Sequence, residues 1–498
     1  MGDRVKKINI NQKISPYIIE QFKLDTNEEY FFTMVDPLKL LIPERIDLIA
    51  KIKYIDSINR DINTDHYKHL YRKTIEAFSE GNYQEPGQSG KNSFAKYEEV
   101  FKELNESIKK AGVDTKKSII PVGDNGAILD GAHRVALSIY YKKQVPVVYL
   151  KNICVNYDSQ YFKNRLLEEN CIDEMMLEYC KLKDVIAICI WPKCNSLNRD
   201  KALEIIHKNL KVIYEKDVYL NYNGLRNFMI EVYRHQDWIG DSTNKHKGVY
   251  QKLDNCYLKN ESLKVILIEN TNDEVTNIKS EIRDILKMGN HCIHSTDDRE
   301  ETIQLFSLVA NENTINFLNN GDPDCFSSLQ EEIEKLKKVC KDNEINLEDI
   351  VIDSSSVLAL YGIRENNDLD FLVSDLLIDK MKSLNLETHN SELRYYDNSL
   401  DDLLYNPQNY FIYNELKFLS LSIVKKMKQK RNEKKDKDDV VLINHLNKNN
   451  FKTLLKKRKI ALKRKLRNVK TNLKIKIKLV LKKIGCYDIL KKYLKKKR

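Results

Sequence analysis

Two aspartates in the last third of the chain are spaced so that they could share one divalent cation. Asp368 and Asp370 stand two residues apart in Asn-Asp-Leu-Asp-Phe-Leu-Val, whose apolar residues favour a strand. Residues two apart on a strand point to the same face, so both carboxylates could reach one ion. Mg²⁺ or Mn²⁺ prefers carboxylate oxygens together with nucleotide phosphates. The pair therefore predicts a phosphate-transfer site with Asp368 and Asp370 as catalytic residues and metal ligands.

Small residues before this pair add a turn at which phosphate could be bound. Ser355 and Ser356 follow a strand-like segment, and their size lets backbone amides and hydroxyls approach a triphosphate. Asp397, after strand-like residues 393–396, is a candidate third metal ligand. The turn followed by Asp-x-Asp resembles the nucleotidyltransferase superfamily signature, which implies a nucleotide substrate, here ATP or CTP. The alternative is that the acids only face solvent.

A histidine in the middle of the chain has neighbours that suit a phosphate carrier. His294 lies in Gly-Asn-His-Cys-Ile-His-Ser-Thr-Asp, and phosphate transfer needs a neutral imidazole with cations close by. The segment resembles the nucleoside diphosphate kinase pattern, and the order of elements is similar over residues 185–318. The resemblance implies that His294 accepts phosphate and that Arg283 and Thr296 contact it. The alternative is a binding or scaffold domain in which His294 is an ordinary pocket residue.

A glycine turn in the N-terminal third predicts an anion site at the start of a helix. In Asp-Gly-Ala-His-Arg, Gly131 permits a tight turn, and His133 and Arg134 would add donors to the helix amides. The string resembles the ParB/sulfiredoxin superfamily, which implies nucleotide or phosphate binding. A purely structural turn is the alternative.

The elements that must position these residues alternate between strands and helices. This pattern predicts a multidomain chain of α/β and α+β class. The resemblances above imply a ParB/sulfiredoxin-like domain at residues 1–155, a ferredoxin-like (nucleoside diphosphate kinase-like) domain at 180–325 and a nucleotidyltransferase-like domain at 330–447, and residues 451–498 are expected to form a basic amphipathic helical tail.

Charge is divided unevenly along the 498 residues. Residues 451–498 contain 21 lysines and arginines and one acid, Asp488, a local charge of +20. Because the whole chain carries +11, the other 450 residues carry −9, which disfavours nucleic acid as a partner of the body. An apolar stripe along the tail at spacings of three and four suits an anionic membrane surface. A solvated or RNA-adhesive tail is the alternative.

These features together predict a nucleotide-dependent enzyme that transfers a nucleotidyl or phosphoryl group to a small acceptor. We expect a nucleotidyltransferase or kinase-type phosphotransferase, with surface-polysaccharide building blocks as one setting for it. The other hypothesis is a nucleotide-binding regulatory protein whose kinase-like fold is inactive and whose ParB-like turn is a switch coupled to DNA or membrane. With no apolar segment long enough for a signal peptide and with 10 cysteines that form no paired motif, a cytoplasmic protein, peripheral on the inner membrane face, is expected.

Overall fold

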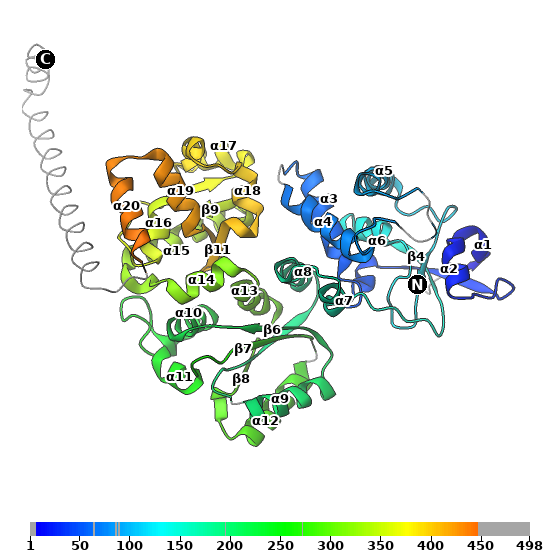
Figure 1. Cartoon of the computed structure of the whole chain (residues 1–498), viewed down its shortest axis with the longest axis horizontal. Helices are drawn as coiled ribbons and strands as arrows, with labels where there is room; N and C mark the ends of the chain where they lie inside the picture. The colour runs from blue at the N-terminus through cyan, green and yellow to red at the C-terminus, as the bar shows by residue number, and fades with distance from the viewer. Residues whose placement is uncertain are drawn as a thin grey trace, which may run out of the picture. The chain divides into compact units, whose positions relative to one another are not determined.

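The computed structural model describes residues 6–62, 65–84, 87, 90–194, 196–270 and 272–446 (Figure 1). The chain is a mixed α/β protein that divides into two compact units, residues 1–420 and residues 421–498. The described part of the first unit contains three four-stranded sheets, which follow one another along the chain. The class expected from the sequence, α/β with several parts, is confirmed at this level.

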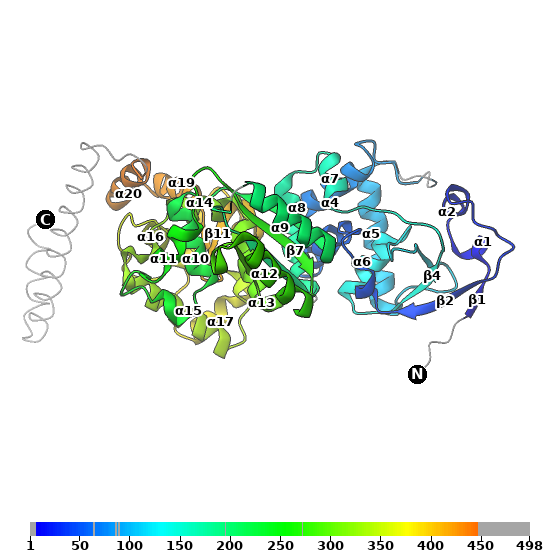
Figure 2. The ribbon, with the colours of Figure 1, turned by 90° about the horizontal axis from the view of Figure 1, so that it is seen from below.

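The first sheet has the strand order β1-β2-β4-β3 and is mixed, because β3 and β4 are parallel and the other pairs are antiparallel. Helix α3 packs against α4 and α6, and Figure 2 shows β1, β2 and β4 beside α1 and α2. The strands are β1 Lys6–Ile8, β2 Tyr30–Val35, β3 Ile120–Val122 and β4 Val145–Tyr149. The helices are α1 Ile10–Lys13, α2 Pro16–Gln21, α3 Asp47–Asn59, α4 Asp65–Phe78, α5 Phe94–Ala111 and α6 Ala132–Tyr140, and α7 Ser159–Asn164 and α8 Glu169–Leu182 lead to the next sheet.

The second sheet is antiparallel throughout, in the order β6-β7-β5-β8. Its central strand β5 is apolar at every position because helices cover both faces, α9 and α12 on one and α8, α10 and α13 on the other (Figure 1). The strands are β5 Val185–Ile190, β6 Val212–Val218, β7 Leu263–Glu269 and β8 Ile293–Ser295. The helices are α9 Ser196–Asn209, α10 Tyr222–Val232, α11 Val249–Cys256, α12 Asn272–Leu286, α13 Arg299–Val309 and α14 Glu312–Asn320.

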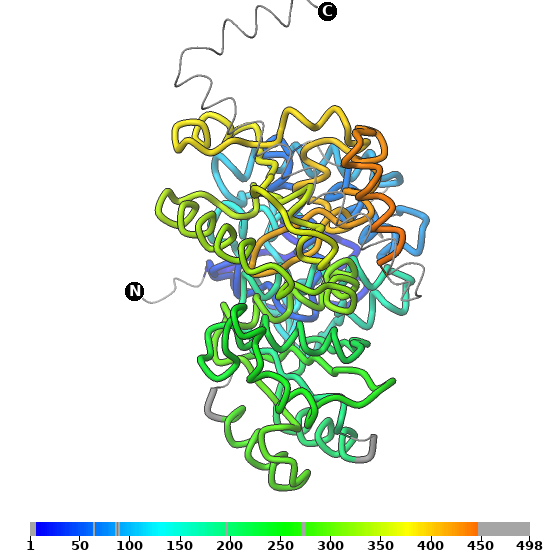
Figure 3. Tube along the Cα trace, turned by 90° about the vertical axis from the view of Figure 1, so that its left-hand side faces the viewer, coloured from blue at the N-terminus to red at the C-terminus, as the bar shows by residue number. Residues whose placement is uncertain are grey.

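The third sheet has the order β10-β9-β12-β11, in which β9 and β12 are parallel and the outer pairs antiparallel. Figure 3 follows the Cα trace from the blue N-terminal stretch through the green middle to this yellow and orange part. The strands are β9 Ile350–Ile352, β10 Phe371–Val373, β11 Tyr410–Tyr413 and β12 Leu416–Leu419. The helices are α15 Ser327–Asp342, α16 Ser354–Leu360, α17 Ile378–Ser383 and α18 Leu400–Tyr405, with 3-10 helices η5 Leu347–Asp349 and η7 His389–Tyr395.

In the second unit, helices α19 Leu421–Arg431 and α20 Lys434–Asn444 pack against each other. An ion pair of 2.9 Å between Arg431 and Asp436 joins them. The basic tail predicted at residues 451–498 lies outside the described residues. Among the helices that are described, none is both long enough and apolar enough to cross a lipid bilayer.

Candidate functional site

Asp353, Asp370 and His389 bring three ligand atoms within 4.8 Å of one another. Asp353 follows β9 and caps α16, whereas Asp370 directly precedes β10. These strands are antiparallel neighbours, and the Asp353 amide donates a hydrogen bond of 2.9 Å to the Asp370 carbonyl. His389 reaches the same place from the first residue of η7. Two carboxylates and an imidazole form a donor set that fits a divalent cation.

The Asp353 carboxylate is held by two side chains from one later segment. It is fully buried, at 0% exposure, so its charge needs partners. The His389 Nδ1 lies 3.0 Å from both carboxylate oxygens, and the Tyr396 hydroxyl donates to Oδ2 at 2.5 Å. These contacts fix the orientation of Asp353 before any ligand arrives.

The pKa values of this group reflect its excess of negative charge. Burial and the charges of Asp353 and Asp368 raise the pKa of Asp370, although His389 and a hydrogen bond from Ser354 oppose that shift. Burial lowers the pKa of His389, but the hydrogen bond to Asp353 and the nearby carboxylates outweigh it, so the net shift is upward. The group therefore attracts protons and cations alike.

The structure changes two details of the predicted aspartate pair. Strand β10 begins at Phe371, so Asp368 and Asp370 precede it and do not share a strand face. Asp368 is exposed and lies outside the three-residue group, as does the exposed Asp397. The expectation of a strand at residues 393–396 is wrong, because these residues belong mostly to the 3-10 helix η7.

The serines of the turn are oriented inward. Ser356 is fully buried, and its hydroxyl donates to the Asp368 carbonyl at 3.3 Å, which ties the aspartate segment to α16. Ser355 is also buried, at 6% exposure. Ser354 contacts the Asp370 carboxylate and has a left-handed backbone, with φ of 54°, a conformation that is uncommon outside glycine and clusters at functional sites. The predicted nucleotide-binding roles of Ser355 and Ser356 stay predictions.

His294 lies in a second polar cluster, of opposite charge. It projects from β8, and its ring centroid is 6.3 Å from that of Trp191 and 5.1 Å from that of Tyr233. The Lys252 ammonium lies 5.6 Å and 5.2 Å from the same two ring centroids. Burial, followed by the charges of Lys279, Lys252 and Arg283, lowers the pKa of His294 to about 3. The imidazole is therefore neutral at physiological pH, as a phosphate acceptor requires.

Two donors near this histidine have no partner within the described residues. The Nε of Arg283 and the indole Nε1 of the fully buried Trp191 are both buried and form no hydrogen bond there. Unsatisfied buried donors favour an acceptor such as an anion. The Thr296 hydroxyl accepts from the Ala187 amide at 3.0 Å and lies 2.7 Å from the Thr302 hydroxyl. Its side chain thus joins β5 to α13, and its predicted contact with phosphate stays a prediction.

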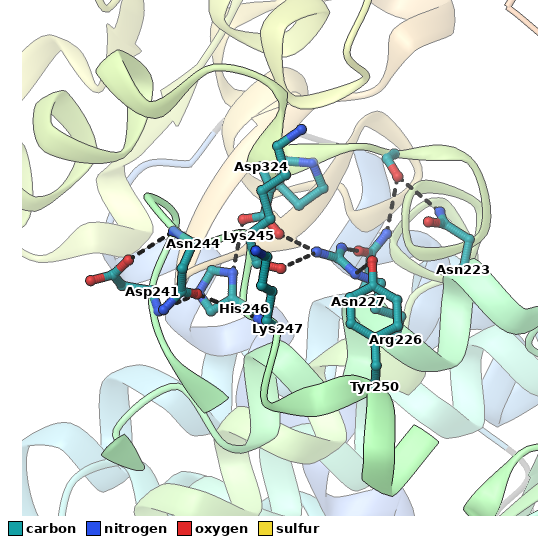
Figure 4. Close-up of polar contacts among 12 residues, drawn as sticks. Asn223, Arg226, Asn227, Asp241, Asn244, Lys245, His246, Lys247, Tyr250 and Asp324 are labelled. Atoms are coloured by element: carbon teal, nitrogen blue, oxygen red, sulfur yellow. Dashed lines mark hydrogen bonds and ion pairs between the residues drawn. The ribbon is translucent and has the colours of Figure 1, made fainter. Parts of the chain in front are cut away.

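A buried network fixes the loop that leads to Lys252 (Figure 4). Asp324 stands between His246, whose Nδ1 lies 2.9 Å from Oδ1, and Arg226, whose guanidinium pairs with the other carboxylate oxygen. Arg226 also donates to the Lys245 carbonyl and to the Tyr250 hydroxyl, each at 3.1 Å. Tyr250 belongs to α11, the helix that also carries Lys252, so the network sets where this helix begins.

The N-terminal turn has the backbone expected from the sequence, but its histidine side chain is buried in the core. Gly131 caps α6 with φ of 89°, and an added Cβ would lie 2.5 Å from a side-chain atom of Ile120, so only glycine fits. Arg134 pairs with Asp130 at 3.1 Å. His133 is in the core, at 7% exposure, and its Nε2 lies 2.7 Å from the Tyr71 hydroxyl. The ring therefore lies among core residues beside Tyr71, and the predicted roles of Gly131, His133 and Arg134 in binding an anion stay predictions.

Sequence reasoning missed four residues of these clusters, namely Asp353, His389, Tyr396 and Lys252. Asp353 had a local signal, because an acid directly after a buried strand and before small residues lies at a sheet edge. The other three had none, since they join their clusters from distant segments. Comparisons with protein-family models, curated proteins and solved structures each find no match to this chain.

Proposed function

We propose that the protein transfers a nucleotidyl or phosphoryl group from ATP or CTP to a small acceptor, in a reaction that depends on Mg²⁺ or Mn²⁺. The observation that carries this proposal is the convergence of Asp353, Asp370 and His389 within 4.8 Å at the ends of two adjacent strands. The Asp-x-Asp order after a serine turn supports a nucleotidyltransferase-like fold for this part. A divalent cation held by these three residues would neutralise triphosphate charge.

The remaining residues of the cluster have positioning and proton-transfer roles in this proposal. Tyr396 orients the Asp353 carboxylate, and Ser354 does the same for Asp370. In this proposal the carboxylate of the exposed Asp368 accepts the proton of the acceptor hydroxyl. Asp368 is close enough to the metal group for its charge to raise the pKa of Asp370. In nucleotidyl transfer the acceptor oxygen bonds to the α-phosphorus, the bond from that phosphorus to the β-phosphate breaks, and pyrophosphate leaves.

A second candidate function is nucleotide binding by the middle part without turnover. It is favoured by the cationic cluster of Lys252, Lys279 and Arg283 around His294, which suits an anion whether or not chemistry follows. Two strand–helix–strand units interleave in this sheet. In β5-α9-β6 the two strands flank β7, and in β7-α12-β8 the two strands flank β5. This interleaving supports a nucleoside diphosphate kinase-like fold. In this candidate, the ParB-like turn at Gly131 would couple nucleotide binding to DNA or membrane.

Labelled nucleotides separate these functions. We would incubate the full chain with Mn²⁺ and with ATP or CTP labelled at the α- or the γ-phosphate, in the presence of polyols, amino acids or phospho-sugars. Transfer of α-label with release of pyrophosphate indicates nucleotidyl transfer, and transfer of γ-label to the acceptor indicates a kinase. Acid-labile γ-label on the protein that is lost in His294→Gln indicates a phosphohistidine. Nucleotide binding without any transfer would contradict the enzyme and favour the second candidate.

The membrane part of the proposal concerns the basic tail. We infer that the lysines and arginines of residues 451–498 hold the enzyme at the anionic inner face of a membrane, where a surface-polysaccharide precursor could be the acceptor. Truncation after Asn450 should release the protein from vesicles that contain anionic lipid, and continued sedimentation of the truncated chain with those vesicles would contradict this role.

A further inference from the structure

A cavity of about 910 Å³ lies within residues 1–420, apart from both clusters described above. Its walls come from α4, α8 and α13, from the start of α14, and from β11 and β12. Glu348, which lines it, precedes β9, whereas Asp353 follows this strand, so the cavity and the metal group lie at opposite ends of β9. The volume is in the range of about 300 to 1,000 Å³ that is typical of small-molecule sites.

The charges along one wall of the cavity are already paired. The Lys181 ammonium lies 2.5 Å from a Glu348 carboxylate oxygen and 3.4 Å from one of Glu178. The His66 Nε2 lies 2.7 Å from Glu174. Cations of the protein itself neutralise these carboxylates, so they contribute little electrostatic attraction for a ligand.

Other carboxylates that line the cavity have no such partner. Glu168, Glu300 and Glu312 are exposed, and none of the three forms an ion pair within the described part of the chain. Each stands at the N-terminus of a helix (α8, α13 and α14, respectively), where the helix dipole offsets only about half a charge. Over the whole lining, nine Asp and Glu side chains stand against three lysines (Lys53, Lys181 and Lys417) and three histidines, so the cavity has an excess of negative charge, which attracts cations and repels phosphates.

The rest of the lining is apolar and aromatic. Leu70, Leu177 and Ile412 present hydrocarbon, and Tyr67 and Tyr410 add rings. The Tyr410 hydroxyl forms no hydrogen bond with any described residue, so a ligand could supply its partner. This surface matches a carbon chain more closely than it matches a hydrated inorganic ion.

We propose that this cavity binds an organic cation, an aliphatic amine whose carbon chain covers the apolar lining and whose ammonium faces Glu300 and Glu312. The site does not depend on the proposed transfer reaction, because it shares no residue with the metal group or with the His294 cluster. The excess of carboxylates over lysines in the lining disfavours a nucleotide or a sugar phosphate as its ligand.

Three molecules with the same eight-carbon chain test the charge preference. Isothermal titration of the full protein with 1,8-diaminooctane should show one site, 1,8-octanediol should bind about tenfold more weakly, and octanedioate should not bind, since two ammonium–carboxylate contacts are lost or reversed. Raising the salt concentration should weaken the diamine most. Binding of the diol or the dicarboxylate as tight as that of the diamine, or no binding of the diamine, would overturn the proposal.

Substitutions locate the site. Glu300→Gln and Glu312→Gln are on the surface and should each weaken the diamine about two- to fivefold, whereas the matched variant Glu331→Gln, exposed on α15 outside the cavity, should not. Equal affinity in the Glu300 and Glu312 variants and the wild type would place the diamine elsewhere and refute this site. Because the readout is binding alone, such a failure leaves the proposed transfer reaction unaffected.

Discussion

The two polar clusters use a histidine in opposite ways. His389 lies beside the carboxylates of Asp353 and Asp370, which raise its pKa in spite of burial. His294 lies beside lysines and an arginine, and burial together with those charges lowers its pKa to about 3. His389 can bind a cation together with the two carboxylates, whereas His294 is a neutral base among positive charges. The comparison shows that neighbours, more than residue type, decide which chemistry an imidazole can perform.

The largest difference is expected in the titration of the two histidines. With ¹³C-labelled histidine, the NMR signal of His294 should stay that of a neutral ring between pH 5 and 8, while that of His389 should titrate above the ordinary value of 6.5. His294→Gln and His389→Asn assign the signals.

The two histidines also affect stability in opposite ways. His389 stabilises the fold fully below its unfolded pKa and loses this effect as pH rises through its folded pKa. His294 acts in the other direction, because the unfolded chain binds its proton first as pH falls below 6.5. Similar titration of both rings would break the comparison.

Loss of a carboxylate should reduce metal binding next most strongly. Asp370→Asn should weaken Mn²⁺ binding by roughly 100-fold or more, since even residues that only support a metal ligand contribute 10- to 100-fold. Asp397 is an exposed acid between η7 and α18, outside the metal group, and Asp397→Asn should change the affinity less than about twofold. Electron paramagnetic resonance of free Mn²⁺ measures both variants. Equal losses of Mn²⁺ affinity in the two variants would show that Asp353, Asp370 and His389 do not hold the ion specifically.

The positive cluster should respond to removal of its lysine. Lys252→Met keeps a long apolar chain over Trp191 and Tyr233 but deletes the charge, and should weaken pyrophosphate binding about tenfold. The same change should raise the pKa of His294, because Lys252 is one of the charges that lower it. Lys247→Met is the matched control, since Lys247 is exposed on the adjoining loop. Pyrophosphate binding unaffected by Lys252→Met would separate this lysine from the site.

The smallest effect is expected from the serine that ties the aspartate segment to α16. Ser356→Ala removes one hydrogen bond of 3.3 Å to the Asp368 carbonyl and should lower the free energy of unfolding by about 1 kcal/mol. Urea unfolding of the variant and the wild type measures this difference, and Mn²⁺ affinity should change far less than in Asp370→Asn, because Ser356 bonds to Asp368, which lies outside the metal group. A loss of metal binding as large as that of Asp370→Asn would mean that the serine itself is a ligand.

Much of the secondary structure could be predicted from local patterns. The apolar run at residues 185–190 predicts a strand, and β5 has these bounds. Apolar residues at helical spacing predict helices over residues 274–287 and 298–309, and α12 and α13 begin and end within two residues of these limits. The prediction of a strand at residues 393–396 was wrong. It rested on tyrosines, which favour strands, but in the structure the Tyr396 hydroxyl binds Asp353 and the residues before it form η7.

By itself, the sequence determined much of the secondary structure and the presence of acids, cations and a glycine turn at the ends of its elements. It predicted a strand at Asp370, which β10 forms only from Phe371 onward, and a tight turn at Gly131 before a helix, because both depend on neighbours within a few residues. Only the tertiary structure decided that Asp370 would meet Asp353 and His389, that His133 would enter the core, and that Lys252 would lie beside His294. The physical reason is that charge, burial and metal geometry depend on through-space distances between segments far apart in the chain, which no local pattern encodes.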